Sequence, residues 1–441
     1  MLAAEHKIEN SQALLRRLDQ ARAQTDKLFE LVRPDFLYDR PIPERHRIVF
    51  YIGHLEAFDW NLLRPRISNV KPFDESMDRL FAFGIDPVDG GLPSDQPSDW
   101  PALEQVRRYG ARVREALDGA LNRAGRVPEI LLNTAIEHRL MHAETLAYML
   151  HQLPLDKKVR QAQVGVAERE APRPEAIEIP AGSIRLGLSR QDPDFGWDNE
   201  YEAHIVSVPG FAIDRYKVTN GQFLEFMRAG GYQDRSLWTA ADREWKAAQD
   251  IRHPVTHPAF WNPAANRWHL KTMLEEIPLP LSWPVYVSQA EAAAYARWDG
   301  KRLPTEAEWQ RAAYGSNSGV ERRFPWGAEA PGPEHGYFGL ERWDPAPVDA
   351  FPGGRSAFGL DGLLANGWEW TASPFEPYPG FEAFPFYEGY SANFFDGKHF
   401  VMKGGSPRTD GSMLRRSFRN WFQPHYPYVY AGFRCASGGS Q

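Results

Sequence analysis

The chain of 441 residues has a single cysteine, Cys435, which excludes an intramolecular disulfide and any metal site built from several thiolates. It also has no excess of positive charge, since 51 Lys and Arg face 58 Asp and Glu and give a net charge of -7. Such a chain has no electrostatic attraction for nucleic acid or anionic membranes. No apolar run approaches the ~20 residues of a membrane span, and the N-terminus is polar. We expect a cytoplasmic protein without nucleic-acid or membrane partners, in which histidines or carboxylates bind any metal.

Two domains are expected, because a chain of this length exceeds one ordinary hydrophobic core. The 15 tryptophans are concentrated after residue 190, which indicates two halves of different architecture. Between them, residues 156–176 lose periodicity and gather charge and proline, as interdomain linkers do. We therefore predict a first domain over 1–155 and a second over 177–441.

The first domain is predicted to be a four-helix bundle. Apolar residues recur with the helical period in four segments, roughly 11–32, 43–63, 99–124 and 127–152. The first segment carries one apolar stripe, formed by Leu14, Leu18, Ala21, Thr25, Leu28 and Val32. Such a stripe must pack on other helices, and an up-and-down bundle is the simplest arrangement that satisfies it.

The second domain has the pattern of an irregular α+β fold. Short apolar strands and Gly/Pro turns alternate with three helices that each begin with a capping box, in which a Ser or Thr precedes a Glu or Gln by three positions. These pairs are Thr219 with Gln222, Ser288 with Glu291, and Thr305 with Glu308. The last two helices are expected to end at a glycine.

Three histidines of the first domain are predicted to bind one metal ion. His138 and His142 are four residues apart in "EHRLMHAET" and share one helix face, and His54 lies between Phe50 and Phe58 on an apolar stripe. Three inward imidazoles without a ligand would need several buried hydrogen bonds, and one divalent metal removes that cost. The ligand set suits either catalytic zinc or non-haem Fe(II).

Two glutamates flank the histidine pair. Glu137 and Glu144 are either hydrogen-bond partners of the imidazoles or solvated helix charges, and the sequence favours neither reading.

The second domain resembles a known family in several motifs. "DRYKVTNGQFLEFM", "KRLPTEAEWQRAAYG", "FPWG", "ANGWEWTASPF", "KGGSPRT" and "AGFRCA" are similar to the formylglycine-generating-enzyme-like, C-type-lectin-related fold over nearly all of 177–441. Formylglycine generation is not expected, because that activity relies on a cysteine pair and this chain has only Cys435.

Joined to a DinB-like bundle with His54, His138 and His142, the whole chain resembles the ergothioneine-type non-haem iron sulfoxide synthases. The resemblance implies Fe(II) held by these three histidines, and O2 as a substrate. It also implies that a chalcogen donor is joined to the imidazole of a histidine derivative, usually hercynine.

Further site residues follow from the same resemblance. "FGWDNE" at 195–200 and "FRNWF" at 418–422 resemble further family motifs, and ordinary aromatic packing is the alternative reading of the second. In a substrate site, Asn420 would hold the carboxylate or the amide edge of hercynine. Trp421, with Tyr387, would supply a cation–π cage for its trimethylammonium. Some relatives have a proton-donating tyrosine near the metal, and alignment by eye could place Phe384 at its position, so Tyr387 and Tyr390 are the candidates for that role. Met141 stands where the family has a glutamine.

The chain departs from the family at the chalcogen donor. Synthases that use γ-glutamylcysteine have an acid and an arginine where this chain has Phe422 and Tyr426. Without these charges, the site favours a neutral selenosugar donor, and the chain most resembles the selenoneine synthases. The alternative donors are cysteine and γ-glutamylcysteine, which the ergothioneine and ovothiol branches use. Two other classes stay open, a zinc-dependent DinB-like transferase or hydrolase and a catalytically inactive binding module.

Overall fold

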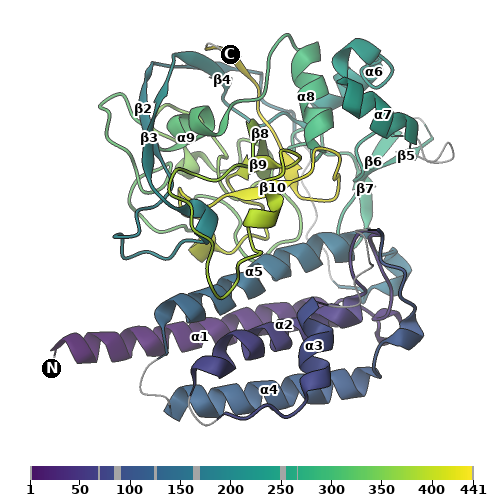
Figure 1. Ribbon diagram of the computed structural model, residues 1–441. Coiled ribbons are helices and arrows are strands. Elements are labelled where there is room, and N and C mark those ends of the chain that lie inside the picture. Colours follow the sequence, from purple (N-terminus) through teal and green to yellow (C-terminus); the bar gives the residue numbers. More distant parts are fainter. Residues whose placement is uncertain are drawn as a thin grey trace. The chain divides into compact units, whose positions relative to one another are not determined.

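The computed structural model describes residues 2–67, 70–83, 91–123, 127–161, 169–248, 255–265 and 267–439. It divides into two compact units, Met1–Ala162 (unit 1) and Gln163–Gln441 (unit 2), and Figure 1 shows unit 1 as helical and unit 2 as mixed helix and sheet. Over the described ranges, every helix is too short or too polar to cross a membrane. The expected fold class, a helical bundle followed by an irregular α+β domain, is confirmed.

The described part of unit 1 contains four long α-helices and one short one: α1 Leu2–Glu30, α2 Ile48–Leu63, α3 Glu75–Phe83, α4 Leu103–Arg123 and α5 Glu129–Gln152. Helix α1 packs on α5, and α2 packs on α3, α4 and α5. The predicted stripe of α1 is buried, from Leu14 at 4% exposure to Leu28 at 0%. The bundle prediction is thus confirmed, whereas the short helix α3 was not predicted.

The segment after α5 still packs on unit 1. The amide of Val159 donates to the carbonyl of Leu31 at 2.8 Å, and the amide of Arg33 donates to the carbonyl of Lys157 at 3.0 Å. The first strand of unit 2 begins at Ala176. The predicted linker over 156–176 therefore starts with residues that pair with the segment just after α1.

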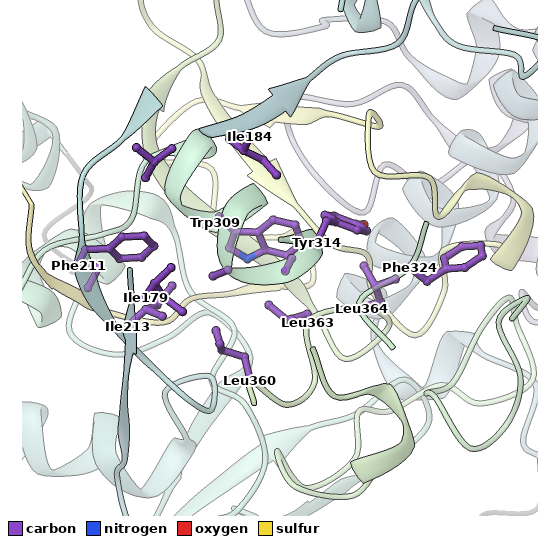
Figure 2. Packing of buried hydrophobic residues seen from close by; sticks show 14 of the residues in the cluster. Ile179, Ile184, Phe211, Ile213, Trp309, Tyr314, Phe324, Leu360, Leu363 and Leu364 are labelled. Carbon is purple, nitrogen blue, oxygen red and sulfur yellow. The ribbon is translucent and has the colours of Figure 1, made fainter. Parts of the chain in front are cut away.

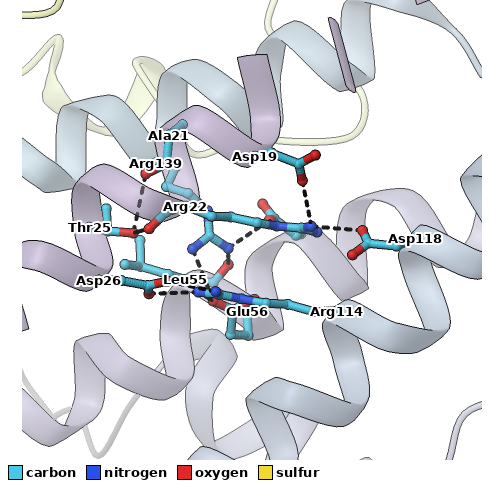
Figure 3. Close-up of polar contacts among 11 residues, drawn as sticks. Asp19, Ala21, Arg22, Thr25, Asp26, Leu55, Glu56, Arg114, Asp118 and Arg139 are labelled. Atoms are coloured by element: carbon cyan, nitrogen blue, oxygen red, sulfur yellow. Dashed lines mark hydrogen bonds and ion pairs between the residues drawn. The ribbon is translucent and has the colours of Figure 1, made fainter. Parts of the chain in front are cut away.

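Buried ion pairs hold α2 against α5 (Figure 3). The guanidinium of Arg139, which is fully buried, donates to Glu56 at 3.0 Å and to Asp59 at 2.7 Å. Burial alone would raise the pKa of Glu56, but Arg139 and Arg114 outweigh it and hold this pKa at about 2. For Asp59, burial is the stronger effect, and the pKa is raised. Since Arg139 directly follows His138, these contacts fix the helix that carries two of the candidate metal ligands.

Unit 2 contains twelve described strands in four small sheets. They are β1 Ala176–Ile179, β2 Gly182–Leu186, β3 His204–Val208, β4 Phe211–Asp214, β5 Trp261–Ala264, β6 Arg267–Lys271, β7 Glu276–Pro278, β8 Trp368–Pro374, β9 Phe400–Lys403, β10 Asn420–Phe422, β11 Ala431–Gly432 and β12 Ala436–Gly438. The sheets have the strand orders β1-β4-β12, β10-β9-β8-β11, β2-β3 and β5-β6-β7. All pairs are antiparallel except β11 with β8.

The described helices of unit 2 are α6 Asn220–Arg228, α7 Ala240–Ala248, α8 Gln289–Trp298 and α9 Glu306–Tyr314. The capping boxes predicted at the starts of α6, α8 and α9 are all present. Gly300 follows α8 with φ of +67°, the left-handed conformation expected of a terminal glycine. Helix α7 was not predicted.

The core of unit 2 surrounds α9 (Figure 2). The buried indole of Trp309 on α9 lies among Ile179 of β1, Ile184 of β2 and Phe211 of β4. The single cysteine, Cys435, is also fully buried, and burial raises the pKa of its thiol well above the usual value. A thiol in that environment is a packed side chain rather than a nucleophile.

Candidate functional site

Unit 1 brings the three predicted histidines together. His54 on α2 and His138 and His142 on α5 each offer a ring nitrogen, and these atoms all lie within 4.8 Å of one another. The Nε2 atoms of His54 and His142 are 3.3 Å apart. His54 and His138 are buried at 9% and 2% exposure, and His142 is partly buried. We call these residues the histidine triad.

The tautomer of His54 is set by a backbone carbonyl. Its Nδ1 lies 2.7 Å from the carbonyl oxygen of Phe81 on α3. Because a carbonyl only accepts, Nδ1 carries the proton and Nε2 keeps a lone pair that faces the triad. Gly53 makes this contact possible, since a Cβ at that position would lie 2.4 Å from the Phe81 ring. Sequence reasoning missed Phe81, because the nine-residue helix that carries it has too few turns for a clear periodic signal.

All three imidazoles are held neutral. Burial lowers the pKa of His54 to about 4, and the nearby His46 and Arg139 add to this effect while the Phe81 carbonyl opposes it. Burial also lowers the pKa of His138 and His142 well below the usual value, and the neighbouring imidazoles lower it further. Neutral imidazole is the form that binds a metal, so the triad fits a divalent cation.

Aromatic rings surround the triad. Phe58 stacks on His138 with ring centroids 3.4 Å apart, and Phe50 stacks on His54 at 4.7 Å. Of the two flanking glutamates, Glu137 is buried at 2% exposure and Glu144 is partly buried. Met141, a predicted substrate-binding residue, is partly buried one position before His142.

In unit 2, the structure gathers four of the predicted site residues, Phe384, Tyr387, Tyr390 and Trp421, into one group of rings, the aromatic cluster. Trp421 on β10 makes an edge contact with Tyr390 at 5.5 Å, and Tyr390 stacks on Trp197 at 4.1 Å. Tyr387 lies 5.4 Å from Tyr390. The cluster consists of Trp197, Phe375, Phe384, Tyr387, Tyr390, Phe394 and Trp421.

The predicted hercynine residues lie at the start of β10. The amide of Trp421 donates to the side-chain oxygen of Asn420 at 2.9 Å, which leaves the NH2 group of Asn420 as a donor. One face of the Trp421 indole is covered by Phe375, at 4.1 Å and 6°. Sequence reasoning did not identify Phe375, because it is separated from Trp421 by more than forty positions.

The "FGWDNE" motif connects the segments that form the aromatic cluster. Ser391 donates to Asp198 at 2.5 Å and accepts from Asn199 at 3.0 Å. Glu200 accepts from Arg415 at 2.8 Å and from Ser417 at 2.7 Å. These bonds fix residues 384–391 and 415–421 to one short stretch of chain.

Phe384 is more buried than the candidate tyrosines, although all three rings contact Trp197. Phe384 is buried at 5% exposure and contacts Trp197, so it belongs to the wall of the cluster. Burial and the Asp198 carboxylate raise the pKa of Tyr387 to about 12. Tyr387 therefore keeps its phenolic proton at neutral pH, as a proton donor must.

Phe422 and Tyr426, the predicted donor-binding residues, face each other. Their rings stack at 5.2 Å and 12°, and Tyr428 lies edge-on to Tyr426 at 5.3 Å. Both Phe422 and Tyr426 are half-buried. They form an uncharged aromatic surface next to Trp421 in the chain.

Comparisons with known proteins agree with this organisation. A family model described as the sulfatase-modifying factor enzyme 1-like domain matches residues 161–438, and the DinB superfamily model matches residues 17–152. Hercynine oxygenase of Mycobacterium tuberculosis is 37% identical over 75% of this chain and 77% of its own length. Hercynine oxygenase of Mycolicibacterium smegmatis is 38% identical over 78% and 79%. Ergothioneine biosynthesis protein 1 of Neurospora crassa is 28% identical over 92% of this chain and 55% of its own length.

The fold and the triad define a class of two-unit proteins in which a DinB-type bundle precedes a sulfatase-modifying-factor-like unit. The chain belongs to this sulfatase-modifying factor enzyme 1-like family and, within it, to the enzyme family of the hercynine oxygenases.

Proposed function

We propose that this protein is an O2-dependent non-haem Fe(II) oxidoreductase that joins a chalcogen donor to the imidazole ring of hercynine. The observation that carries the proposal is the histidine triad, in which three neutral imidazoles present ring nitrogens within 4.8 Å of one another. The names of the most similar relatives support hercynine and oxygen as substrates.

The triad would hold the metal, with the Nε2 of His54 aimed by the Phe81 carbonyl. Bound Fe(II) would supply the one-electron chemistry that O2 requires. Zinc has no redox chemistry, so a zinc-dependent transferase or hydrolase is the second candidate for the same triad. Metal analysis of the purified protein, followed by an activity assay with each metal, separates the two.

Hercynine recognition is assigned to the aromatic cluster. An indole face stabilises a trimethylammonium by cation–π attraction, and Trp421 is a half-buried indole among other rings. The NH2 group of Asn420 is a donor suited to the hercynine carboxylate. Tyr387 and Tyr390 are the proposed proton donors, and Tyr387 is protonated at neutral pH.

The donor is proposed to be a selenosugar, and the product selenoneine after loss of the sugar and two-electron reduction of the selenium by a thiol. The stacked rings of Phe422 and Tyr426 support this, because aromatic faces pack on sugar rings and offer no charge to a γ-glutamyl peptide. A selenol also has a much lower pKa than the ~8.5 of a thiol, so it is ionised at neutral pH without a basic residue.

A competition assay tests the donor. Iron-loaded enzyme is given hercynine, O2 and equal concentrations of a selenosugar, the matching thiosugar, cysteine and γ-glutamylcysteine, and the products are identified by mass spectrometry. We expect the selenosugar adduct, or selenoneine, to dominate. Dominance of the cysteine or γ-glutamylcysteine sulfoxide would instead assign the enzyme to the ovothiol or ergothioneine branch.

A double variant tests the role of Phe422 and Tyr426 in the same assay. Phe422→Asp with Tyr426→Arg restores the charges found in the γ-glutamylcysteine enzymes, so it should shift the product ratio towards the γ-glutamylcysteine adduct. Trp298→Ala removes an exposed aromatic ring of the same unit and should leave the ratio unchanged.

A further inference from the structure

Unit 2 contains a cavity of about 630 Å³ that the proposed reaction does not use. Its walls come from the start of α7, from α8 and the residues after it, and from the segments next to β9 and β10. This volume lies within the range of small-molecule sites, roughly 300–1,000 Å³. Phe422 and Tyr426 are not among the described residues that line it.

The single carboxylate among the described lining residues is already paired. Asp242 is 6% exposed and lies 2.8 Å from the Nε2 of His425, whose ring stacks on Trp245 at 4.4 Å and 2°. The other oxygen of Asp242 accepts from the backbone amide of Thr239 at 2.9 Å. Both oxygens of Asp242 are therefore engaged by the protein, and its one negative charge is outnumbered by the cations of the lining.

The cavity carries four permanent cations. Lys301 is paired with Asp214 and Asp299, and Arg302 is paired with Glu308. The other two cations, Arg297 and Lys398, are exposed and make no ion pair within the described ranges. The lining thus offers uncompensated positive charge at two points.

A buried amide also faces the cavity. Gln289 on α8 is 8% exposed, and its side chain has no hydrogen-bond partner among the described residues. The amide atoms themselves are not enclosed, so water reaches them, and a ligand in the cavity can replace that water as hydrogen-bond partner. Between the polar groups, the walls are apolar, with Ala293, Leu303 and Phe400.

We propose that this cavity binds an organic anion, a carboxylate or phosphate carried on an apolar body. Arg297 and Lys398 attract the anionic group, Gln289 hydrogen-bonds to it, and Ala293, Leu303 and Phe400 pack on the body. Charge-assisted hydrogen bonds provide the selectivity for an anion over a neutral molecule of the same shape. The site is independent of the metal and of the chalcogen donor.

Calorimetry on the 441-residue chain tests the site with simple probes. Benzoate and phenyl phosphate carry an anion on an apolar body, benzamide is the neutral counterpart of benzoate, and inorganic phosphate lacks the body. We expect binding of benzoate or phenyl phosphate, with benzamide and inorganic phosphate each weaker by about tenfold or more. The tighter of the two anions identifies whether carboxylate or phosphate is preferred.

Substitutions in the cavity test whether the anions bind there. Arg297→Glu with Lys398→Glu should weaken the anions by about tenfold or more, and Ala293→Phe should block them by filling the cavity. Arg185→Glu with Arg228→Glu makes the same charge change at exposed positions outside the lining and should have no effect. The proposal is wrong if no anion binds, if benzamide binds as well as benzoate, or if both charge-reversal pairs weaken binding equally. None of these outcomes bears on iron binding or turnover.

Discussion

At the scale of single residues, the state of each triad imidazole is set by groups around it. A histidine ligates a metal through a ring nitrogen that has kept its lone pair. At His54, the Phe81 carbonyl holds the proton on Nδ1, and burial keeps the ring neutral. The other two rings are kept neutral by burial and by each other. A cation would then bind the lone pairs that neutral imidazoles carry.

Removing one triad member should greatly weaken metal binding and abolish turnover. His142→Ala leaves two imidazoles, so we expect the iron content of the purified protein to fall greatly and turnover to be lost. Plasma mass spectrometry measures the iron, and product analysis measures the turnover. His269→Ala, which removes a half-buried histidine of β6 in unit 2, is the matched control and should keep its iron. An iron-replete, active His142→Ala enzyme would disprove the triad as the iron site.

The metal-free protein should lose stability in mild acid through His54. The pKa of His54 is about 4 in the folded state against 6.5 ordinarily, so the unfolded chain takes up the proton first as the pH falls. His54 therefore has no effect above pH 6.5 and lowers the free energy of unfolding between pH 6.5 and 4, by roughly 3 kcal/mol in total. Urea unfolding at several pH values measures this. The glutamine of His54→Gln cannot titrate, so the free energy of unfolding of this variant should depend less steeply on pH. A dependence as steep as that of the unmodified protein would contradict the prediction.

Trp421 should contribute to hercynine affinity. If its indole contacts the trimethylammonium, Trp421→Ala should lose about 0.5–2 kcal/mol of binding free energy, while Trp421→Phe keeps part of it. Calorimetry with hercynine and with histidine measures the effect, and histidine should bind less well because its ammonium is smaller and better hydrated. Trp298→Ala serves as the control. Equal affinity of the parent enzyme for hercynine and histidine would argue against the cage.

At the scale of elements, the triad depends on how closely α3 approaches α2. The approach is allowed by Gly53, because its missing Cβ leaves room for the buried ring of Phe81. The side chain of Asp78 also anchors α3, since it accepts from Trp60 at 3.0 Å and from Tyr109 at 2.7 Å. The position of the Phe81 carbonyl is thus set by packing between helices.

Gly53→Ala should therefore disturb the metal centre. Alanine favours a helix over glycine by ~1 kcal/mol, but the added Cβ would lie 2.4–2.5 Å from three ring carbons of Phe81. Overpacking of this kind costs about 1–3 kcal/mol, so we expect lower stability and weaker metal affinity, measured by urea unfolding and metal titration. Gly119→Ala is the control, because its Cβ would meet only the flexible end of Arg123 at 3.3 Å. A more stable Gly53→Ala protein with unchanged metal affinity would refute this account.

The sequence predicted elements and residues whose signals are local. The α1 stripe and the His138–His142 pair follow from the helical period, and the capping boxes follow from a spacing of three. The nine-residue helices α3 and α7 were not predicted, because two helical turns carry little periodic signal. Contacts between segments that are distant in the sequence were not predicted either, such as those of Phe81 with His54 and of Phe375 with Trp421. These depend on tertiary packing, which no spacing in the sequence encodes.

At the scale of the whole molecule, the metal ligands and most of the predicted substrate residues belong to different units. The triad lies entirely in Met1–Ala162, whereas Tyr387, Asn420 and Trp421 lie in Gln163–Gln441. Each unit has its own buried groups, with the Arg139 ion pairs in the first and the Trp309 core in the second. A separate core in each unit is the condition for independent unfolding.

Metal should accordingly stabilise unit 1 alone. A ligand that binds only the folded state adds about 2.7 kcal/mol at a concentration 100 times its Kd. In calorimetric melting of the full chain, we expect two transitions, of which anaerobic Fe(II) raises only one. Leu363→Ala removes a fully buried side chain from the core of unit 2, at a cost of about 2–5 kcal/mol, and should lower only the other transition. His142→Ala should cancel the shift caused by Fe(II). A single transition that both Fe(II) and Leu363→Ala displace would show instead that the two units unfold together.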